Sequence, residues 1–207
     1  MITYSDIPQG SDEWLAERAG LLTASNAKKM MAGKTTATYK SYVDDLWEER
    51  VCGYVPSNGF VSAAMVEGSE REPEARAALA WDLNRDIEEV GLATNSSYPG
   101  AGASLDGLID GSIGVEIKVR KLSRLRDWKD YTHQIMFQMM ICDLEAVYYW
   151  GYPKLYPNAA IQPTPFLHLI ERDEDKISLM RERYLETNKL INEKAQKEID
   201  RNEHETG

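Results

Sequence analysis

The chain has 207 residues, of which 43% are hydrophobic and 28% are charged, and these are ordinary values for a folded globular protein. They argue against wholesale disorder, so we expect one domain over residues 1–207, with a flexible C-terminal tail from about residue 202. No run of about 18 apolar residues is present, and the first residues lack the charged-then-apolar pattern of a signal peptide. Cys52 and Cys142 form no CxxC pair, which argues against a zinc site or a disulfide framework. We therefore expect a cytoplasmic protein without a membrane span.

The formal net charge of −10 argues at first against nucleic acid as a partner. Net charge is a global sum, however, and a basic groove can coexist with an acidic exterior. Residues 118–129, with the sequence KVRKLSRLRDWK, form the most basic segment of the chain. A solvated basic loop explains this segment equally well when it is taken by itself, so the charge pattern leaves the class of partner open.

Taken in chain order, the first predicted element is a short helix over residues 11–20. A second helix is expected to begin at Thr23 or Ser25 and to end near Met31. A hydroxyl at its start would satisfy the free amides of the first turn, and the same amides would make the helix start an anion-binding site.

Two longer helices follow. Residues 39–51 have apolar side chains at helical spacing, and after a loop at residues 53–59 a helix is predicted from about Ser62 to Leu83. Pro73 lies inside this helix and predicts either a kink or the start of a new helix. Several glutamates crowd the same region. Most of them should form a solvated face, and Glu72, next to Pro73, is the candidate to point inward.

From Ile87 onward the spacing of apolar residues changes to that of strands. Strands are predicted at residues 89–93, 103–106, 114–119, 146–152 and 166–170, a buried helix at residues 128–142, and an amphipathic helix from residue 173 to about 201. This order of elements predicts an α/β fold with a central mixed sheet of about five strands flanked by helices.

The segment from Asp106 to Lys118 places charged residues in an otherwise apolar hairpin. Glu116 and Lys118 share one face of their predicted strand, about 7 Å apart, and burying such charges is costly unless they bind a metal or do chemistry. A two-residue loop of Asp110 and Gly111 would turn Asp106 to the other face. An odd-length loop or a bulge would set Asp106 opposite Glu116. A clustered acidic site therefore predicts either an odd loop, such as Asp110-Gly111-Ser112 with Gly111 or Ser112 at positive φ, or a bulge, for which Gly111 and Gly114 are available.

Carboxylates without His or Cys favour Mg²⁺ or Mn²⁺ over zinc. Such ions polarise a phosphoryl oxygen and lower the pKa of bound water, as hydrolysis of a phosphodiester requires. Lys118 could orient or deprotonate that water, because a metal charge would lower the pKa of its amine. An ion pair on an exposed sheet face is the alternative explanation for so short a pattern.

The hairpin resembles the core of the PD-(D/E)xK nucleases, with Leu105 in the place of the family's proline. The wider chain, from about Gln9 to Tyr184, is similar to the lambda-exonuclease or YqaJ-like viral recombinase family. The matching blocks are Gln9-Gly10-Ser11-x-x-Trp14, Arg18-x-Gly20-x-x-Thr23-Ala24-Ser25, Gly68-x-x-x-Glu72-x-x-Ala75-Arg76, Ser104-x-Asp106-Gly107-Leu108, Val115-Glu116-Ile117-Lys118, His133-Gln134-x-x-x-Gln138 and Glu171-Arg172-Asp173-Glu174. Ordered blocks over most of the chain are more specific than any one of them.

This resemblance implies a metal-dependent exonuclease that degrades one strand of duplex DNA from the 5′ end and leaves 3′ overhangs for single-strand annealing. Asp106, Glu116 and the backbone carbonyl of Ile117 would bind Mg²⁺, or Mn²⁺ in its place, and two ions are expected. Lys118 would be the catalytic lysine. Glu72 would be the helical acid that assists the water or a second metal ion, and Gln134 would approach the same centre. The alternative interpretation of Gln134 is a polar residue that satisfies core backbone groups.

Arg18, Thr23 and Ser25 match the family's pocket for the terminal 5′-phosphate. A forked, always-charged donor with two hydroxyls also suits an anion on physical grounds. The alternative interpretation of Arg18 is a plain surface arginine. The basic residues offered as further DNA contacts, for which the resemblance gives no clean match, are Lys34, Lys40, Arg120, Lys121 and Arg124.

The resemblance further implies a ring-shaped homotrimer around DNA, in a bacterial host cell and encoded by a phage or prophage. Its partner would be a single-strand annealing protein of the same recombination system. An acidic exterior around a basic channel would reconcile the net charge of −10 with DNA binding. Two alternatives remain: an endonuclease on the same core, and a non-catalytic accessory that binds DNA ends.

Overall fold

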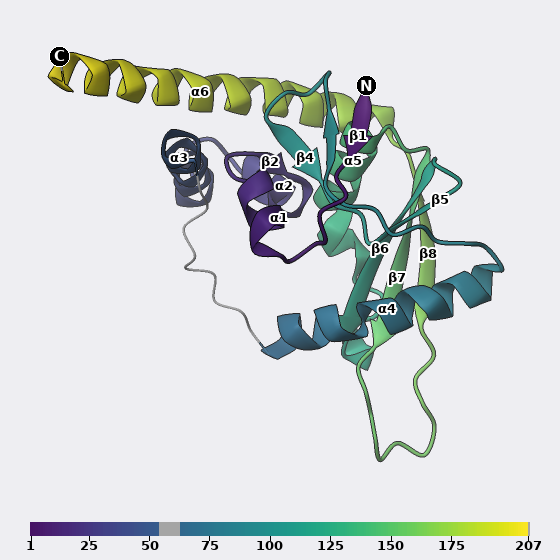
Figure 1. Ribbon diagram of the computed structural model, residues 1–207. Helices are drawn as coiled ribbons and strands as arrows, with labels where there is room; N and C mark the ends of the chain where they lie inside the picture. The colour runs from purple at the N-terminus through teal and green to yellow at the C-terminus, as the bar shows by residue number, and fades with distance from the viewer. Residues whose placement is uncertain (54–62, 207) are drawn as a thin grey trace.

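In the described part of the chain, residues 1–53 and 63–206 of a computed structural model, two four-stranded mixed sheets carry the fold (Figure 1). The α/β class is confirmed, but the strands form two sheets where the sequence predicts one of about five strands. The first sheet has the order β1-β3-β4-β2, with β1 Ile2–Tyr4, β3 Ala93–Asn95, β4 Ala101–Ala103 and β2 Leu22–Thr23. The second has the order β5-β6-β7-β8, with β5 Gly107–Ile109, β6 Ile113–Arg120, β7 Ala146–Pro153 and β8 Phe166–Glu171.

The second sheet, β5 to β8, carries the predicted hairpin. β5 and β6 are antiparallel, β6 and β7 are parallel, and β7 and β8 are antiparallel again. A parallel pair needs a crossover connection, and helix α5 (Thr132–Cys142) lies in the one between β6 and β7. The helix expected at residues 128–142 thus begins with a separate 3-10 turn at Trp128–Tyr131.

The helices agree with the sequence expectations in position more than in their ends. Thr36 caps α3 by accepting a hydrogen bond from the amide of Tyr39, and Gly53 ends it at φ 72°. A single helix, α4, runs through Pro73, so no second helix starts there. The loop expected at residues 53–59 and the start at Ser62 lie almost wholly outside the described residues. The remaining bounds are α1 Asp12–Glu17, α2 Ala27–Met30, α3 Ala37–Cys52, α4 Ala63–Leu83, α6 Glu174–Thr206 and the 3-10 turns Ala24–Asn26 and Leu122–Arg124.

Helices α4 and α5 cover opposite faces of the β5–β8 sheet (Figure 1). Ala75 and Leu79 of α4 pack with Val115 and Ile117 of β6 in one apolar cluster. The buried side chains of α5 belong to the main core together with Val147 and Tyr149 of β7. Because successive strand residues alternate between faces, Glu116 and Lys118 point away from the α4 side and toward α5.

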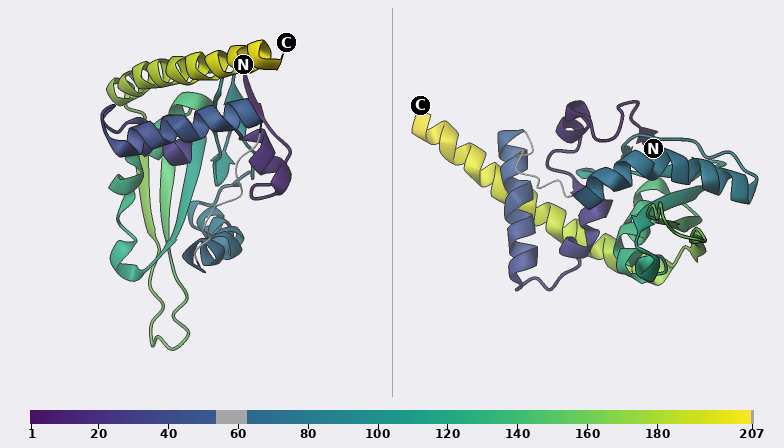
Figure 2. Two further views of the ribbon diagram at one scale, coloured as in Figure 1. Left: turned by 90° about the vertical axis from the view of Figure 1, so that its left-hand side faces the viewer. Right: turned by 90° about the horizontal axis from the view of Figure 1, so that it is seen from below.

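Helix α6 crosses α3 and runs on beyond it (Figure 2). Ile177, Met180, Tyr184 and Ile191 form its buried stripe, as its spacing predicts. Where the sequence predicts a tail from about residue 202, the structure continues the helix to Thr206. Within residues 1–53 and 63–206, no helix is long and apolar enough to cross a membrane.

Candidate functional site

The β5–β6 hairpin brings Asp106 and Glu116 together. Gly107 pairs with Val115 and Ile109 with Ile113, so the register sets Asp106 opposite Glu116. The connection is the three-residue loop Asp110-Gly111-Ser112, with Asp110 at φ 48° and Gly111 at φ 72°. The predicted odd loop is therefore confirmed, and Asp110 shares with Gly111 the positive φ that the turn requires.

Glu116 is fully buried, at 0% exposure, and its charge is compensated on both oxygens. Gln134 donates to Oε1 at 2.7 Å and Gln138 donates to Oε2 at 2.6 Å. Lys118 forms an ion pair with Oε1. An unpaired carboxylate would be strongly disfavoured at this depth, so α5 and β6 together hold Glu116 in one orientation.

Gln138 contacts Glu116 as well, although the sequence pattern assigned this glutamine no role. It is fully buried, and its amide bonds both Glu116 and the backbone carbonyl of Ser104 at 3.0 Å. Its spacing from Gln134 is the available signal, because residues four apart lie on one helical face. Two glutamines at that spacing on a buried helix indicate a shared polar partner.

Asp106 is held at both its side chain and its backbone. Its Oδ2 accepts the amide N–H of Ile117 at 2.6 Å, and its carbonyl accepts Nε of Arg76 at 2.7 Å. Arg76 also forms ion pairs with Glu72 at 2.6 Å and with Glu89 at 2.5 Å. Arg76 is a second residue that the sequence analysis leaves without a role, and it fastens the helix that carries Glu72 to the residue that begins the hairpin.

The cluster of charges shifts the pKa of several groups. Burial and the neighbouring charge of Glu116 raise the pKa of Asp106 to about 8. Burial also raises the pKa of Glu72, against the opposing effect of Arg76. Burial works against a charged Lys118, but Glu116 and Asp106 outweigh it and raise the pKa of the amine. The protein's own carboxylates thus act in the opposite direction to the lowered pKa expected for Lys118 beside a metal ion.

The donor set suits a hard divalent cation. Asp106 and Glu116 supply carboxylate oxygens from facing positions of the hairpin, and the backbone carbonyl of Ile117 follows Glu116 directly in sequence. The raised pKa of Asp106 reflects its burial and the neighbouring charge of Glu116, and a cation would offset the repulsion between the two carboxylates. Among residues 1–53 and 63–206, no group of three or more His, Cys, Asp or Glu side chains is placed to hold a metal ion. A bound Mg²⁺ would therefore keep several water ligands, which that ion favours.

Arg18, Thr23 and Ser25 converge as the sequence predicts. One guanidinium nitrogen of Arg18 donates to Thr23 at 3.4 Å and to Ser25 at 3.2 Å, and the guanidinium lies 4.3 Å from the ring centre of Trp14. Thr23 occupies the expected N-cap position, but it caps the 3-10 turn Ala24–Asn26 without a side-chain hydrogen bond, and α2 begins only at Ala27. The cradle therefore consists of side chains rather than of a helix N-terminus.

Asp106 borders two cavities. One, of about 130 Å³, is lined by the cradle residues Arg18, Thr23 and Ser25 together with Gln134 and Asp106. The other, of about 280 Å³, is lined by Glu72, Ile117, Lys118, Arg120 and Asp106. The anion cradle and the carboxylate centre are therefore neighbours that share one side chain.

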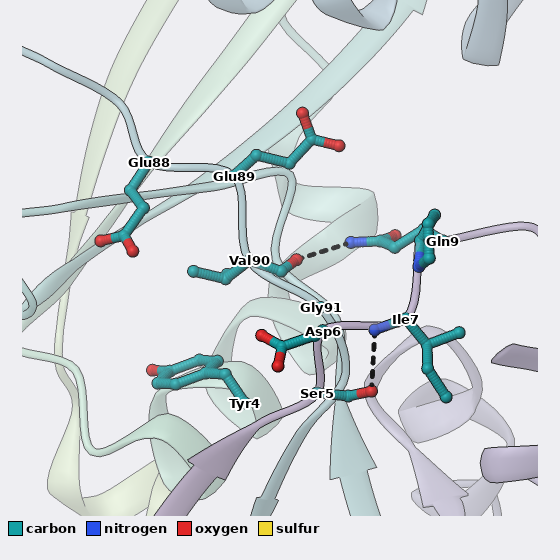
Figure 3. A pocket seen from close by; sticks show the side chains of 10 residues that line it. Tyr4, Ser5, Asp6, Ile7, Gln9, Glu88, Glu89, Val90 and Gly91 are labelled. Atoms are coloured by element: carbon teal, nitrogen blue, oxygen red, sulfur yellow. Dashed lines mark hydrogen bonds between the residues drawn. The ribbon is translucent and has the colours of Figure 1, made fainter.

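Gln9 also lines a larger cavity of about 370 Å³ (Figure 3). Asp6, Glu88 and Glu89 line it, and no lysine or arginine of the described residues does. Such a lining disfavours a phosphate. Gln9 lines both this cavity and the cradle pocket. It donates to the carbonyl of Leu105 at 2.9 Å and so supports the segment that leads into Asp106.

The further basic candidates are dispersed. Arg120 lines the cavity of Lys118 and contacts the hydroxyl of Tyr131. Lys34 forms an ion pair with Glu186 of α6 at 2.7 Å. Lys40 and Lys121 are exposed, and Arg124 forms ion pairs with Asp127 and Asp130. Of this set Arg120 lines the cavity that also contains Lys118, and the DNA contacts of all five residues remain predictions.

The chain is similar in sequence and in fold to known proteins. Residues 13–145 match the family model of the YqaJ-like viral recombinase domain. The chain is similar to the crystal structure of an alkaline exonuclease (LHK-Exo) from Laribacter hongkongensis, with a TM-score of 0.80 and 25% identity over 95% of this chain and 100% of that one. LHK-Exo in complex with dAMP gives a TM-score of 0.79 at the same identity and coverage. A phage-related exonuclease from Haemophilus somnus 129PT shares the fold, with a TM-score of 0.65 and 13% identity over 84% of this chain and 94% of that one. No curated protein sequence matches the chain.

Proposed function

This chain belongs to the YqaJ-like viral recombinase family and is a deoxyribonuclease, and we propose that it digests one strand of linear duplex DNA from the 5′ end in a reaction that depends on Mg²⁺. The product would be a duplex with a 3′ single-stranded overhang. A single-strand annealing protein of a phage recombination system would then use that overhang.

The observation that carries this proposal is the position of Asp106 between the two cavities. A terminal 5′-phosphate bound by Arg18, Thr23 and Ser25 would leave the adjoining part of the strand beside Asp106 and Glu116. An arginine fork with hydroxyl partners suits the dianion of a terminal phosphate better than the single charge of an internal phosphodiester. This arrangement favours cleavage from a 5′ end.

Each residue of the centre would have a defined task. Asp106, Glu116 and the carbonyl of Ile117 would hold Mg²⁺, or Mn²⁺ in its place, with Glu72 next to a second ion or the attacking water. Bound Mg²⁺ would polarise the phosphoryl oxygen and lower the pKa of a bound water. Gln134 and Gln138 would keep Glu116 in orientation. Lys118 would orient the water, take its proton, or stabilise the negative charge of the phosphate with its ammonium group.

Each chain has a net charge of −10. In a ring-shaped homotrimer, basic side chains of the three copies would together line one channel for DNA. Arg120 is the basic side chain that lines the carboxylate cavity directly. Phosphate contacts of this kind make binding weaken as salt is raised, because counterions are released on binding.

The test is Mg²⁺-dependent digestion of one linear duplex prepared with a 5′-phosphate or with a 5′-hydroxyl end. The wild-type protein should digest the phosphorylated end faster, and Arg18→Ala should remove most of that preference. A covalently closed circular duplex should stay intact. Cleavage of the circle would establish the endonuclease alternative instead, and binding of ends without digestion would establish the accessory alternative.

A further inference from the structure

Helix α3 holds the turn between α1 and β2 from two sides. The Oε2 atom of Glu49 accepts the N–H of Gly20 at 2.8 Å, and Nε of Arg50 donates to the carbonyl of the same glycine at 2.8 Å. Gly20 lies at φ 71°, and a Cβ there would come within 2.6 Å of the Arg50 side chain. Both hydrogen-bonding groups of one peptide position are thus held by adjacent residues of α3.

This turn separates the components of the anion cradle. Arg18 lies two residues before Gly20, and Thr23 and Ser25 lie three and five residues after it. Because Arg18 donates to both hydroxyls across the turn, any rotation of the turn changes the spacing of the three groups. The contacts at Gly20 therefore set the geometry of the cradle without lining its pocket.

Arg50 extends the same set of contacts to α6. Its remaining nitrogens donate to Asn188 at 2.8 Å and to Asn192 at 2.6 Å, and more weakly to the carbonyl of Gly100 at 3.4 Å. Gly100 in turn accepts the amide of Leu22, at the start of β2, at 2.9 Å. Arg50 is half-buried and is satisfied by neutral acceptors here, so its contacts are directional rather than those of a surface ion pair.

We propose that Glu49 and Arg50 are positioning residues for the terminal 5′-phosphate, which they serve by holding the Gly20 turn and so the spacing of Arg18 from Thr23 and Ser25. The inference rests on the proposed function of the cradle. Neither residue touches the carboxylate centre, so their effect should fall on the binding of phosphorylated ends. Loss of alignment weakens binding sharply because the donors of a cradle act together.

The experiment compares kcat and KM on linear duplexes with 5′-phosphate and 5′-hydroxyl ends for the wild type, Glu49→Ala, Glu49→Gln and Arg50→Ala. Glu49→Ala and Arg50→Ala should raise KM for the phosphorylated end by on the order of tenfold, with little change in kcat. Their KM for the hydroxyl end should stay near that of the wild type. Glu49→Gln keeps an acceptor for the Gly20 amide and should restore most of the preference.

Lys194→Ala is the matched control. Lys194 forms an ion pair with Asp44 and so joins α6 to α3, as Arg50 does, but it does not contact Gly20. This variant should keep the wild-type preference. Thermal unfolding of each variant shows whether it is folded, and if Arg50→Ala does not fold, Glu49→Ala and Glu49→Gln decide the question alone.

Two failures are distinguishable. If the wild type digests both ends with the same KM, the phosphate cradle itself is wrong and the positioning role ends with it. If the wild type prefers the phosphate and Glu49→Ala keeps that preference, or loses activity equally on both ends, the positioning role is overturned while the proposed function stands.

Discussion

Arg76 of α4 donates through Nε to the backbone carbonyl of Asp106 at 2.7 Å. The same guanidinium forms an ion pair with Glu72 one helical turn earlier. One side chain thus sets the helical acid and the hairpin acid relative to each other, although α4 and β5 are separate in sequence. The stability of the catalytic arrangement should depend on this arginine more than on any surface charge.

Replacing Arg76 with alanine should lower kcat on linear duplex DNA by about 10²-fold, because misplacement of reacting groups by about an ångström has effects of that size. Arg76→Lys should recover only part of the loss, since an ammonium cannot reproduce the planar fork. Arg85→Ala is the control, because it removes the more exposed Arg85–Asp110 ion pair near the same hairpin. Equal activity of Arg76→Ala and Arg85→Ala would contradict the role of Arg76.

Gln138→Ala should lower the free energy of unfolding by about 1–3 kcal/mol, because the carboxylate of Glu116 would lose a hydrogen-bond donor and stay buried. Denaturant unfolding measures the change. Gln138→Glu should be more damaging, since it places a second carboxylate against the first. The control is Gln196→Ala, which removes an exposed bond to Asp200. A Gln138→Ala protein as stable as that control would show that Glu116 does not need the second glutamine.

Asp106 should make the metal-free protein less stable as the pH rises. Its pKa is about 8 in the folded protein against an ordinary 3.8, so the folded state binds the proton more tightly than the unfolded state. The stabilising contribution is then fully present below about pH 4 and is lost as the pH approaches 8. In buffer that contains a metal chelator, Asp106→Asn should have a higher melting temperature than the wild type at pH 8. The difference in melting temperature should shrink toward pH 5.

The same variant tests the metal ligand. Added Mg²⁺ should raise the melting temperature of the wild type at pH 8, because a ligand that binds the folded state stabilises it. Asp106→Asn should show little of this rise. A pH-independent difference between the two proteins would count against the raised pKa, and an equal response to Mg²⁺ would count against Asp106 as a ligand.

Lys118→Ala and Glu116→Ala should each reduce Mg²⁺-dependent digestion by about 10²-fold or more, the usual loss when a group that stabilises the transition state is removed. Single-turnover digestion of a labelled linear duplex measures the rate. Lys189→Ala, which affects only an exposed pair on α6, should leave the rate unchanged. A wild-type rate in either of these two variants would show that the hairpin does not take part in catalysis.

Local patterns determined a large part of the site. Strand periodicity and turn parity are properties of adjacent residues, so the sequence predicted that Asp106 and Glu116 could form one site only across an odd loop or a bulge. The sequence left a two-residue loop open as well. The apolar spacing of residues 128–142 likewise predicted a buried helix, which the structure forms over Thr132–Cys142, and Gln134 and Gln138 share one face of it.

Only the tertiary structure decided the rest. Strands β1 and β2 have three and two residues, too few for a periodic signal, and β1 pairs with a strand some ninety residues away, so the division into two sheets has no local cause. The reach of Arg76 to Asp106, and the hold of Glu49 and Arg50 on Gly20, are likewise contacts between distant segments. Sequence periodicity specifies which face a side chain occupies, whereas the partner that it meets there depends on how the faces of separate elements pack, and this packing placed the phosphate cradle beside the carboxylates.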